Sequence, residues 1–130
     1  MAFDWKEYFN LALSLQGKTK KYTQEASLRC AVSRAYYAAF CYARNYAWHE
    51  HGFEPTYDSD DHNSVREHFR DWQMPSISGW LLQLRQWRND CDYHDTVSNV
   101  SRLCTEAIKQ AQKIFDALEP TMSLGESTQE

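Results

Sequence analysis

The sequence predicts an all-α domain, and three observations lead to that prediction. Only four Gly and three Pro interrupt the 130 residues. β-Branched residues are sparse, and apolar residues recur at helical spacing rather than in the alternation typical of strands. With 42% hydrophobic and 25% charged residues, the composition is that of a globular protein of one domain. We expect this domain over residues 1–120, followed by a flexible acidic tail at residues 121–130.

The first two helices are expected over residues 4–16 and 24–49. Asp4 followed by Glu7 is typical of a capping box at the start of the first helix. Thr23 is a candidate N-cap for the second helix, which is the longest. Four alanines of the second helix leave room for a neighbouring helix to come close: Ala35, Ala38, Ala39 and Ala43.

Three further helices are expected after a polar loop at residues 50–61. The third covers about residues 62–73, and Pro75 separates it from a fourth that starts near Ser78. The fourth helix should end within residues 92–95. The last helix has the clearest amphipathic pattern, with apolar residues over five turns at Val100, Leu103, Cys104, Ala107, Ile108, Ala111, Ile114, Phe115 and Leu118.

Bulk properties exclude several classes of protein. The net charge of -4 is wrong for a basic clamp around a long nucleic acid, so any nucleic-acid contact must come from a local patch. No Cys-x-x-Cys pair occurs among the four cysteines, and no signal peptide or membrane-spanning apolar stretch is evident. We therefore expect a cytoplasmic protein with reduced thiols and no membrane partner.

The most informative stretch is residues 85–94, which read Arg-Gln-Trp-Arg-Asn-Asp-Cys-Asp-Tyr-His. Arginine presents a planar fork of donors to phosphate oxygens, and histidine can move a proton near neutral pH. This inventory is suited to binding and cleaving a phosphodiester.

Two blocks of the chain together resemble the HEPN superfamily (higher eukaryotes and prokaryotes nucleotide-binding domains). Residues 33–40 read Ser-Arg-Ala-Tyr-Tyr-Ala-Ala-Phe, and residues 84–93 read Leu-Arg-Gln-Trp-Arg-Asn-Asp-Cys-Asp-Tyr. The likeness covers residues 5–118. It implies an up-and-down bundle of four or five helices that pairs as a homodimer. Many members are metal-independent ribonucleases, often toxins or defence effectors, and toxin members are commonly paired with a nucleotidyltransferase-like antitoxin.

The hallmark of the active members is an Arg, usually followed by a polar residue, and a His a few residues further on. Arg88, Asn89 and His94 match this pattern and are the candidate catalytic residues. A large subgroup instead carries Asp-Tyr, as at Asp92 and Tyr93 here, and lacks a dependable active histidine. The resemblance thus leaves two interpretations of His94, as a catalytic residue or as an incidental one after a structural motif.

Helical geometry constrains these interpretations. Arg88 and His94 diverge by about 120° on a straight helix. Either the helix ends before His94, which then folds back, or two subunits pool their residues across a two-fold axis. Arg85, Arg88 and Asp92 share a face, so both arginines can bind a phosphate, or Arg88 can pair with Asp92 as a surface ion pair.

Two further residues are candidates for substrate binding, alongside Arg85 and Asp92. Arg34, in the first block, either faces the same cleft or lies on the surface of its helix. Tyr93 can hydrogen-bond a phosphate, although a buried tyrosine that ties the helix end to the core is the favoured interpretation.

The sequence thus predicts a metal-independent, homodimeric endoribonuclease that cleaves RNA. His94 would act as general base or acid, and Arg88 would stabilise charge on the phosphate. The alternative is a non-catalytic helical module that binds a protein or a nucleotide. We expect no metal and no cofactor, because His49 and His51 lack the spacing of a metalloprotease motif and no glycine-rich loop is present.

Overall fold

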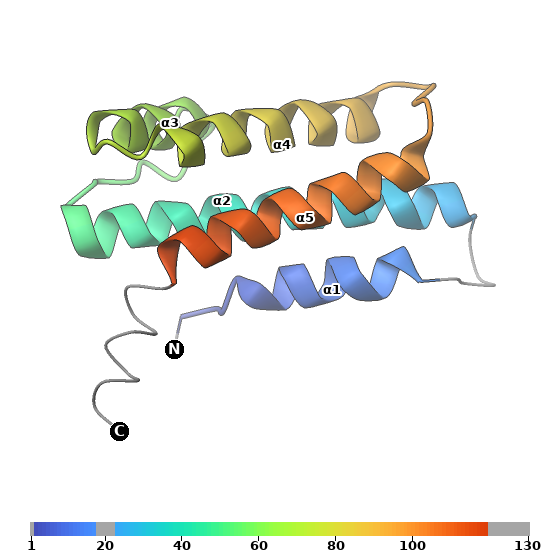
Figure 1. Ribbon diagram of the computed structural model, residues 1–130, viewed down its shortest axis with the longest axis horizontal. Coiled ribbons are helices and arrows are strands. Elements are labelled where there is room, and N and C mark those ends of the chain that lie inside the picture. Colours follow the sequence, from blue (N-terminus) through green and yellow to red (C-terminus); the bar gives the residue numbers. More distant parts are fainter. Residues whose placement is uncertain (1, 18–22, 120–130) are drawn as a thin grey trace.

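The computed structural model describes residues 2–17 and 23–119, and this part of the chain forms five α-helices and no strand. They are α1 (Lys6–Gln16), α2 (Gln24–His51), α3 (Asp61–Asp71), α4 (Pro75–Tyr93) and α5 (Val100–Leu118). Helices α1, α2, α4 and α5 run in alternating directions, and α3 is inserted between α2 and α4 (Figure 1). The predicted all-α bundle is confirmed, whereas the tail expected at residues 121–130 lies outside the described residues.

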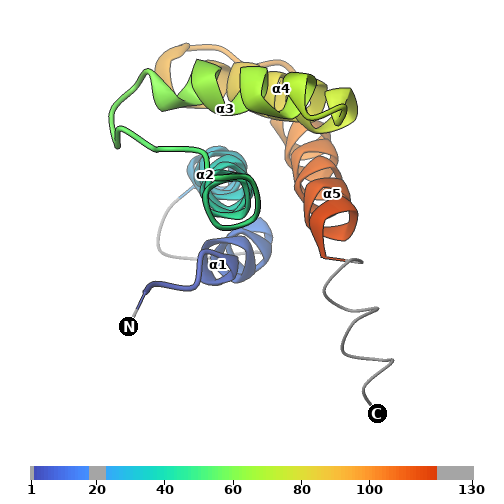
Figure 2. The ribbon, with the colours of Figure 1, turned by 90° about the vertical axis from the view of Figure 1, so that its left-hand side faces the viewer.

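Helix α2 is the central element, and it contacts each of the other four helices. Figure 2 shows α1 on one side of α2 and the α3–α4 pair on the opposite side. The four alanines that were expected to permit close approach are all fully buried. Large side chains from the other helices fill the core around them, including Phe69, Leu81, Leu84, Ile114 and Leu118.

Helix ends follow the expected capping chemistry in α2 and depart from it in α1. The Thr23 side chain accepts a hydrogen bond from the Ala26 N–H at 3.1 Å, which confirms this residue as the N-cap of α2. The capping box at Asp4 is wrong in detail, because Trp5 holds the N-cap position without a side-chain bond. The Asp4 carboxylate instead accepts a hydrogen bond from the Lys6 N–H at 3.0 Å.

Helix α4 begins three residues earlier than expected. Pro75 is its first residue rather than an interruption before it. This position suits proline, because the first helical N–H needs no partner and the ring already fixes the helical φ angle. Among the described helices, none has both the length and the apolar character that crossing a membrane requires.

Helix α1 contacts only α2 and α5 among the described helices. It lies on the side of α2 that faces away from α4 (Figure 2). Side chains from the start of α1, from α2 and from residues 57–62 line a groove.

Candidate functional site

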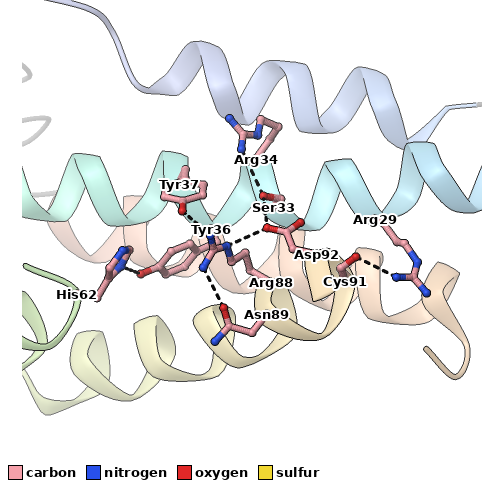
Figure 3. Close-up of polar contacts among 10 residues, drawn as sticks. All are labelled: Arg29, Ser33, Arg34, Tyr36, Tyr37, His62, Arg88, Asn89, Cys91 and Asp92. Atoms are coloured by element: carbon pink, nitrogen blue, oxygen red, sulfur yellow. Dashed lines mark hydrogen bonds and ion pairs between the residues drawn. The ribbon is translucent and has the colours of Figure 1, made fainter. Parts of the chain in front are cut away.

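Arg88 of α4 is the centre of a polar cluster between α4 and α2 (Figure 3). Its terminal nitrogens donate to the Tyr37 hydroxyl at 2.7 Å and to Asn89 Oδ1 at 2.9 Å. Its Nε lies 3.0 Å from Asp92 Oδ2, an ion pair in which the N–H is not aligned for a hydrogen bond. The side chain is only 14% exposed, so Arg88 is held mainly by the protein itself.

Asp92 connects Arg88 to the first sequence block. Its Oδ2 accepts a hydrogen bond from the Ser33 hydroxyl at 3.2 Å, and Ser33 Oγ in turn accepts one from Arg34 at 3.3 Å. The ion pair between Arg88 and Asp92, one of the two interpretations left open by the sequence, is therefore present, but it lies largely covered between α4 and α2 rather than at the surface, as part of a longer polar chain. Ser33 thus links Arg34 to Asp92 through two hydrogen bonds, and Arg34 itself lies on the α1 side of α2 (Figure 3).

His94 follows the last residue of α4 and lies at the surface. Its side chain is 62% exposed, and Nδ1 lies 3.4 Å from Asp90 Oδ1. Helix α4 stays regular through Tyr93, and no hydrogen bond or ion pair joins His94 to Arg88 within the described residues. The helix therefore ends before His94, within the range expected from the sequence, but His94 does not fold back to bond Arg88 in a single subunit.

Arg29 fixes the end of α4, and sequence analysis did not single it out. Its guanidinium donates to the backbone carbonyls of Cys91 at 3.0 Å, His94 at 2.6 Å and Asp95 at 3.1 Å. The last carbonyls of a helix have no partner within the helix, and a cation also interacts favourably with that end of the helix dipole. Arg29 thereby anchors the backbone of His94 to α2, while its imidazole lies beside Asp90 and is exposed to solvent.

Tyr93 corrects one expectation. Its side chain is 69% exposed rather than buried, because the buried residue at this end of α4 is Cys91, and two residues further on a helix point to the other side. The Tyr93 ring lies 5.6 Å from the Arg88 guanidinium. Arg85, the other candidate on this face, is half-buried and its Nε has no hydrogen-bond partner.

His62 at the start of α3 is a residue whose position sequence analysis missed. Its Nδ1 is hydrogen-bonded to the Tyr36 hydroxyl, and its ring stacks on Phe40 at 4.5 Å between centroids. Burial lowers the pKa of His62 to about 4, and the charges of Arg85, Arg88 and Arg66 act in the same direction. The imidazole is therefore neutral at physiological pH. Its i, i+3, i+7 spacing with the buried Val65 and Phe69 is the signal that could have placed it inward.

The acidic run before α3 organises a loop. Asp61 is buried and its carboxylate accepts hydrogen bonds from the Thr56 N–H, the Thr56 hydroxyl and the Tyr57 N–H at 2.8–3.0 Å. Burial alone would raise the pKa of Asp61, but these bonds and the nearby charge of Arg44 outweigh burial and lower it. No group of metal-ligating side chains large enough to hold an ion occurs in residues 2–17 and 23–119.

A groove of about 570 Å³ lies beside this cluster, between α1, α2 and the loop before α3. Two arginines of α2, Arg34 and Arg44, line it together with aromatic rings from three elements. Those rings are Trp5, Tyr8, Tyr37, Phe40 and Tyr57. Only Arg34 of this set was a candidate from the sequence. Tyr37, Phe40 and Arg44 follow it on the same helix, whereas Trp5, Tyr8 and Tyr57 are far from it along the chain and reach the groove only through packing.

Comparisons of the chain with protein-family models, with curated proteins and with solved structures found no match.

Proposed function

We propose that the protein is a metal-independent endoribonuclease of the HEPN type that is active as a homodimer. The observation that carries the proposal is the exposed His94–Asp90 pair at the end of the helix that also holds Arg88. His94 lies beside a carboxylate, is open to solvent and is fixed through its backbone by Arg29. Such a histidine is suited to general acid–base chemistry.

The chemistry assigns one role to each side chain. His94 removes the proton of a ribose 2'-hydroxyl or protonates the leaving 5'-oxygen, and proton transfer of this kind contributes about 10²- to 10⁴-fold. Arg88 stabilises negative charge on the phosphate, since each terminal nitrogen keeps a second N–H that Tyr37 and Asn89 do not use. Attack by the 2'-hydroxyl restricts the reaction to RNA.

Dimerisation is part of the proposal because one subunit does not bring Arg88 and His94 into contact. A two-fold axis would unite the imidazole of each subunit with the guanidinium of the other. In the cell, such an enzyme would act as a toxin or defence effector and would require restraint by a partner such as a nucleotidyltransferase-like antitoxin.

A second candidate function has its own supporting observation. Arg88 already has three partners in Tyr37, Asn89 and Asp92 and is largely covered, as a structural residue would be. In this alternative the chain is a non-catalytic helical module that binds a protein or nucleotide, and residues 88–94 only hold α4 against α2.

Cleavage of RNA in the presence of EDTA tests the proposal. The wild type should cut single-stranded RNA but not DNA of the same sequence, and His94→Ala should reduce the rate by at least about 100-fold. His49→Ala is the matched control, because His49 is an exposed histidine at the far end of α2.

The two candidates give opposite results in this assay. If the dimeric wild-type protein leaves RNA intact both in EDTA and with added divalent metal, the nuclease proposal is lost and the binding module remains. Induced expression provides a second readout, since growth arrest that His94→Ala relieves is expected only of a nuclease.

A further inference from the structure

The groove beside the Arg88 cluster has a composition that neither the helical core nor the cleavage chemistry requires. Its floor is a stripe of α2 that includes Arg34, Tyr37, Cys41 and Arg44. One wall is formed by Trp5 and Tyr8 at the start of α1. The other is formed by the loop before α3 and the first residues of α3. Tyr57 in that loop is 63% exposed, so its ring is accessible to a ligand in the groove.

Aromatic rings hold both arginines of the groove. The Arg34 guanidinium lies 4.9 Å from the Tyr8 ring and 5.2 Å from the Tyr37 ring. The Arg44 guanidinium lies 5.7 Å from the Trp5 ring and 5.1 Å from the Tyr57 ring. Such contacts orient the planar group and occupy its faces, so the N–H donors at its edge remain for a ligand.

Neither guanidinium has a carboxylate partner within ion-pair distance in the described part of the chain. Among residues 2–17 and 23–119, Arg34 donates only to Ser33 Oγ at 3.3 Å, and Arg44 only to Asn45 Oδ1 at 3.1 Å. Unused charged donors in a concave site are suited to an anionic ligand, and arginine matches the geometry of phosphate oxygens.

Two carboxylates also line the groove, and their surroundings differ. Asp61 is buried and its oxygens are engaged by Thr56 and Tyr57, so a ligand does not meet it directly. Asp58 is exposed, and its Oδ1 accepts hydrogen bonds from the Thr56 hydroxyl and the Asp60 N–H. The negative charge of Asp58 therefore weakens the binding of an anionic ligand. Removal of that charge should strengthen binding if the ligand is an anion.

The spacing of the arginines indicates the kind of anion. Arg34 and Arg44 are ten residues apart on one helix, which corresponds to about 15 Å along its axis. A chain of phosphates along the groove would offer each arginine an oxygen of its own. Flat rings between and beside the arginines, including Tyr8 and the exposed Tyr57, offer stacking surfaces for bases.

The groove is also continuous with the candidate catalytic cluster. Tyr37 lines the groove and accepts the hydrogen bond from Arg88, and Arg34 reaches Asp92 through Ser33 (Figure 3). A strand that occupies the groove would therefore approach Arg88 from the α1 side of α2.

We infer that this groove binds a short segment of single-stranded RNA, with Arg34 and Arg44 on its phosphates and Tyr8 and Tyr57 against its bases. The choice of RNA among polyanions rests on the proposed nuclease function. Binding itself does not involve His94, so the groove can be tested apart from cleavage.

The test is fluorescence anisotropy with a labelled 2'-O-methyl oligoribonucleotide of about eight nucleotides, within the range of known single-strand sites. This probe lacks the 2'-hydroxyl and cannot be cleaved by the proposed route. Arg34→Gln and Arg44→Gln should each weaken binding by about tenfold or more, as expected for a lost charged hydrogen bond. Each should also reduce the slope of log K against log salt by about 0.7.

Matched variants distinguish binding in the groove from nonspecific electrostatic attraction to the protein surface. Arg102→Gln removes an exposed arginine of α5 outside the groove and should leave binding unchanged. Asp58→Asn should tighten binding, because it removes the negative charge at the rim. Circular dichroism and thermal unfolding of each variant will show that the fold is intact.

Three results would overturn the inference: no binding by the wild type, equal binding by the Arg34 and Arg44 variants, or equally tight groove-dependent binding of an acidic peptide of the same charge. The nuclease proposal can fail separately, if the probe binds through Arg34 and Arg44 but unmodified RNA is never cut. Conversely, cleavage that is insensitive to both arginines would refute the groove assignment alone.

Discussion

Acidification should destabilise the fold through His62, whose imidazole is kept uncharged by its surroundings. The ring stacks on Phe40 and is hydrogen-bonded to Tyr36, and the guanidinium groups of Arg85 and Arg88 raise the free energy of its charged form. Burial is the largest cause, and together these effects lower the pKa of His62 from 6.5 to about 4.

The sign and size of the effect follow from proton linkage. The unfolded chain binds a proton at His62 below about pH 6.5, whereas the folded chain resists it until about pH 4. Stability is therefore complete above pH 6.5 and falls as the pH decreases toward 4. The difference between the two pKa values sets an upper bound of about 3 kcal/mol on the loss of stability. Because the ring is only half-buried, solvent screening reduces the expected loss to about 1–2 kcal/mol.

Urea unfolding at pH 7 and pH 4.5 measures this loss, with the double variant Tyr36→Phe/His62→Phe as the comparison. The double variant keeps the aromatic stacking and leaves no hydroxyl without a partner. Titration of other groups, such as His68 and Asp61, is common to both proteins and cancels in the difference. The wild type should lose about 1–2 kcal/mol more than the variant between the two pH values. Equal losses would refute the assignment of a depressed pKa to His62.

Three further predictions concern the scaffold. Arg29→Ala should lower the free energy of unfolding by about 1–3 kcal/mol, because carbonyls at the end of α4 lose a charged donor. The control Arg102→Ala should change it by less than about 0.5 kcal/mol, and similar urea midpoints for the two variants would contradict the capping role of Arg29. Thr23→Ala should cost about 1 kcal/mol through loss of the α2 N-cap, and an unchanged midpoint would exclude that role. In a native thiol titration only the exposed Cys30 should react quickly, because burial raises the pKa of the other three cysteines to about 11; more than one fast thiol would contradict their burial.

Local patterns in the sequence were enough to predict the helices. The periodicity of apolar residues in α5 and the alanine stripe of α2 both correspond to buried faces. The i, i+4 spacing of Arg88 and Asp92 also indicated their ion pair as one of two interpretations, since neighbours on one helix meet whatever surrounds them. Each of these features is decided within a few turns of a single helix.

Contacts between distant segments could not be predicted in the same way. Arg29 reaches carbonyls more than sixty residues along the chain, and Tyr36 meets His62 from another helix. Tyr93 was expected to be buried because tyrosine often anchors a helix end, but its burial depends on whether a neighbouring helix covers that side of α4. Such outcomes are set by how the helices pack, which periodicity alone does not specify.

Among the described helices α1 packs against only α2 and α5, and this has a dynamic consequence. This eleven-residue helix has Ala12 as its one fully buried side chain, so it can detach at a lower free energy than the rest of the bundle. Trp5 and Tyr8 would leave with it, and one side of the groove would disappear. Amide protons of α1 should therefore exchange with deuterium earlier than those of α2 and α5, and an occupied groove should slow that exchange. By the same linkage, a substitution that loosens α1 lowers affinity for whatever fills the groove, even if it touches none of the bound atoms.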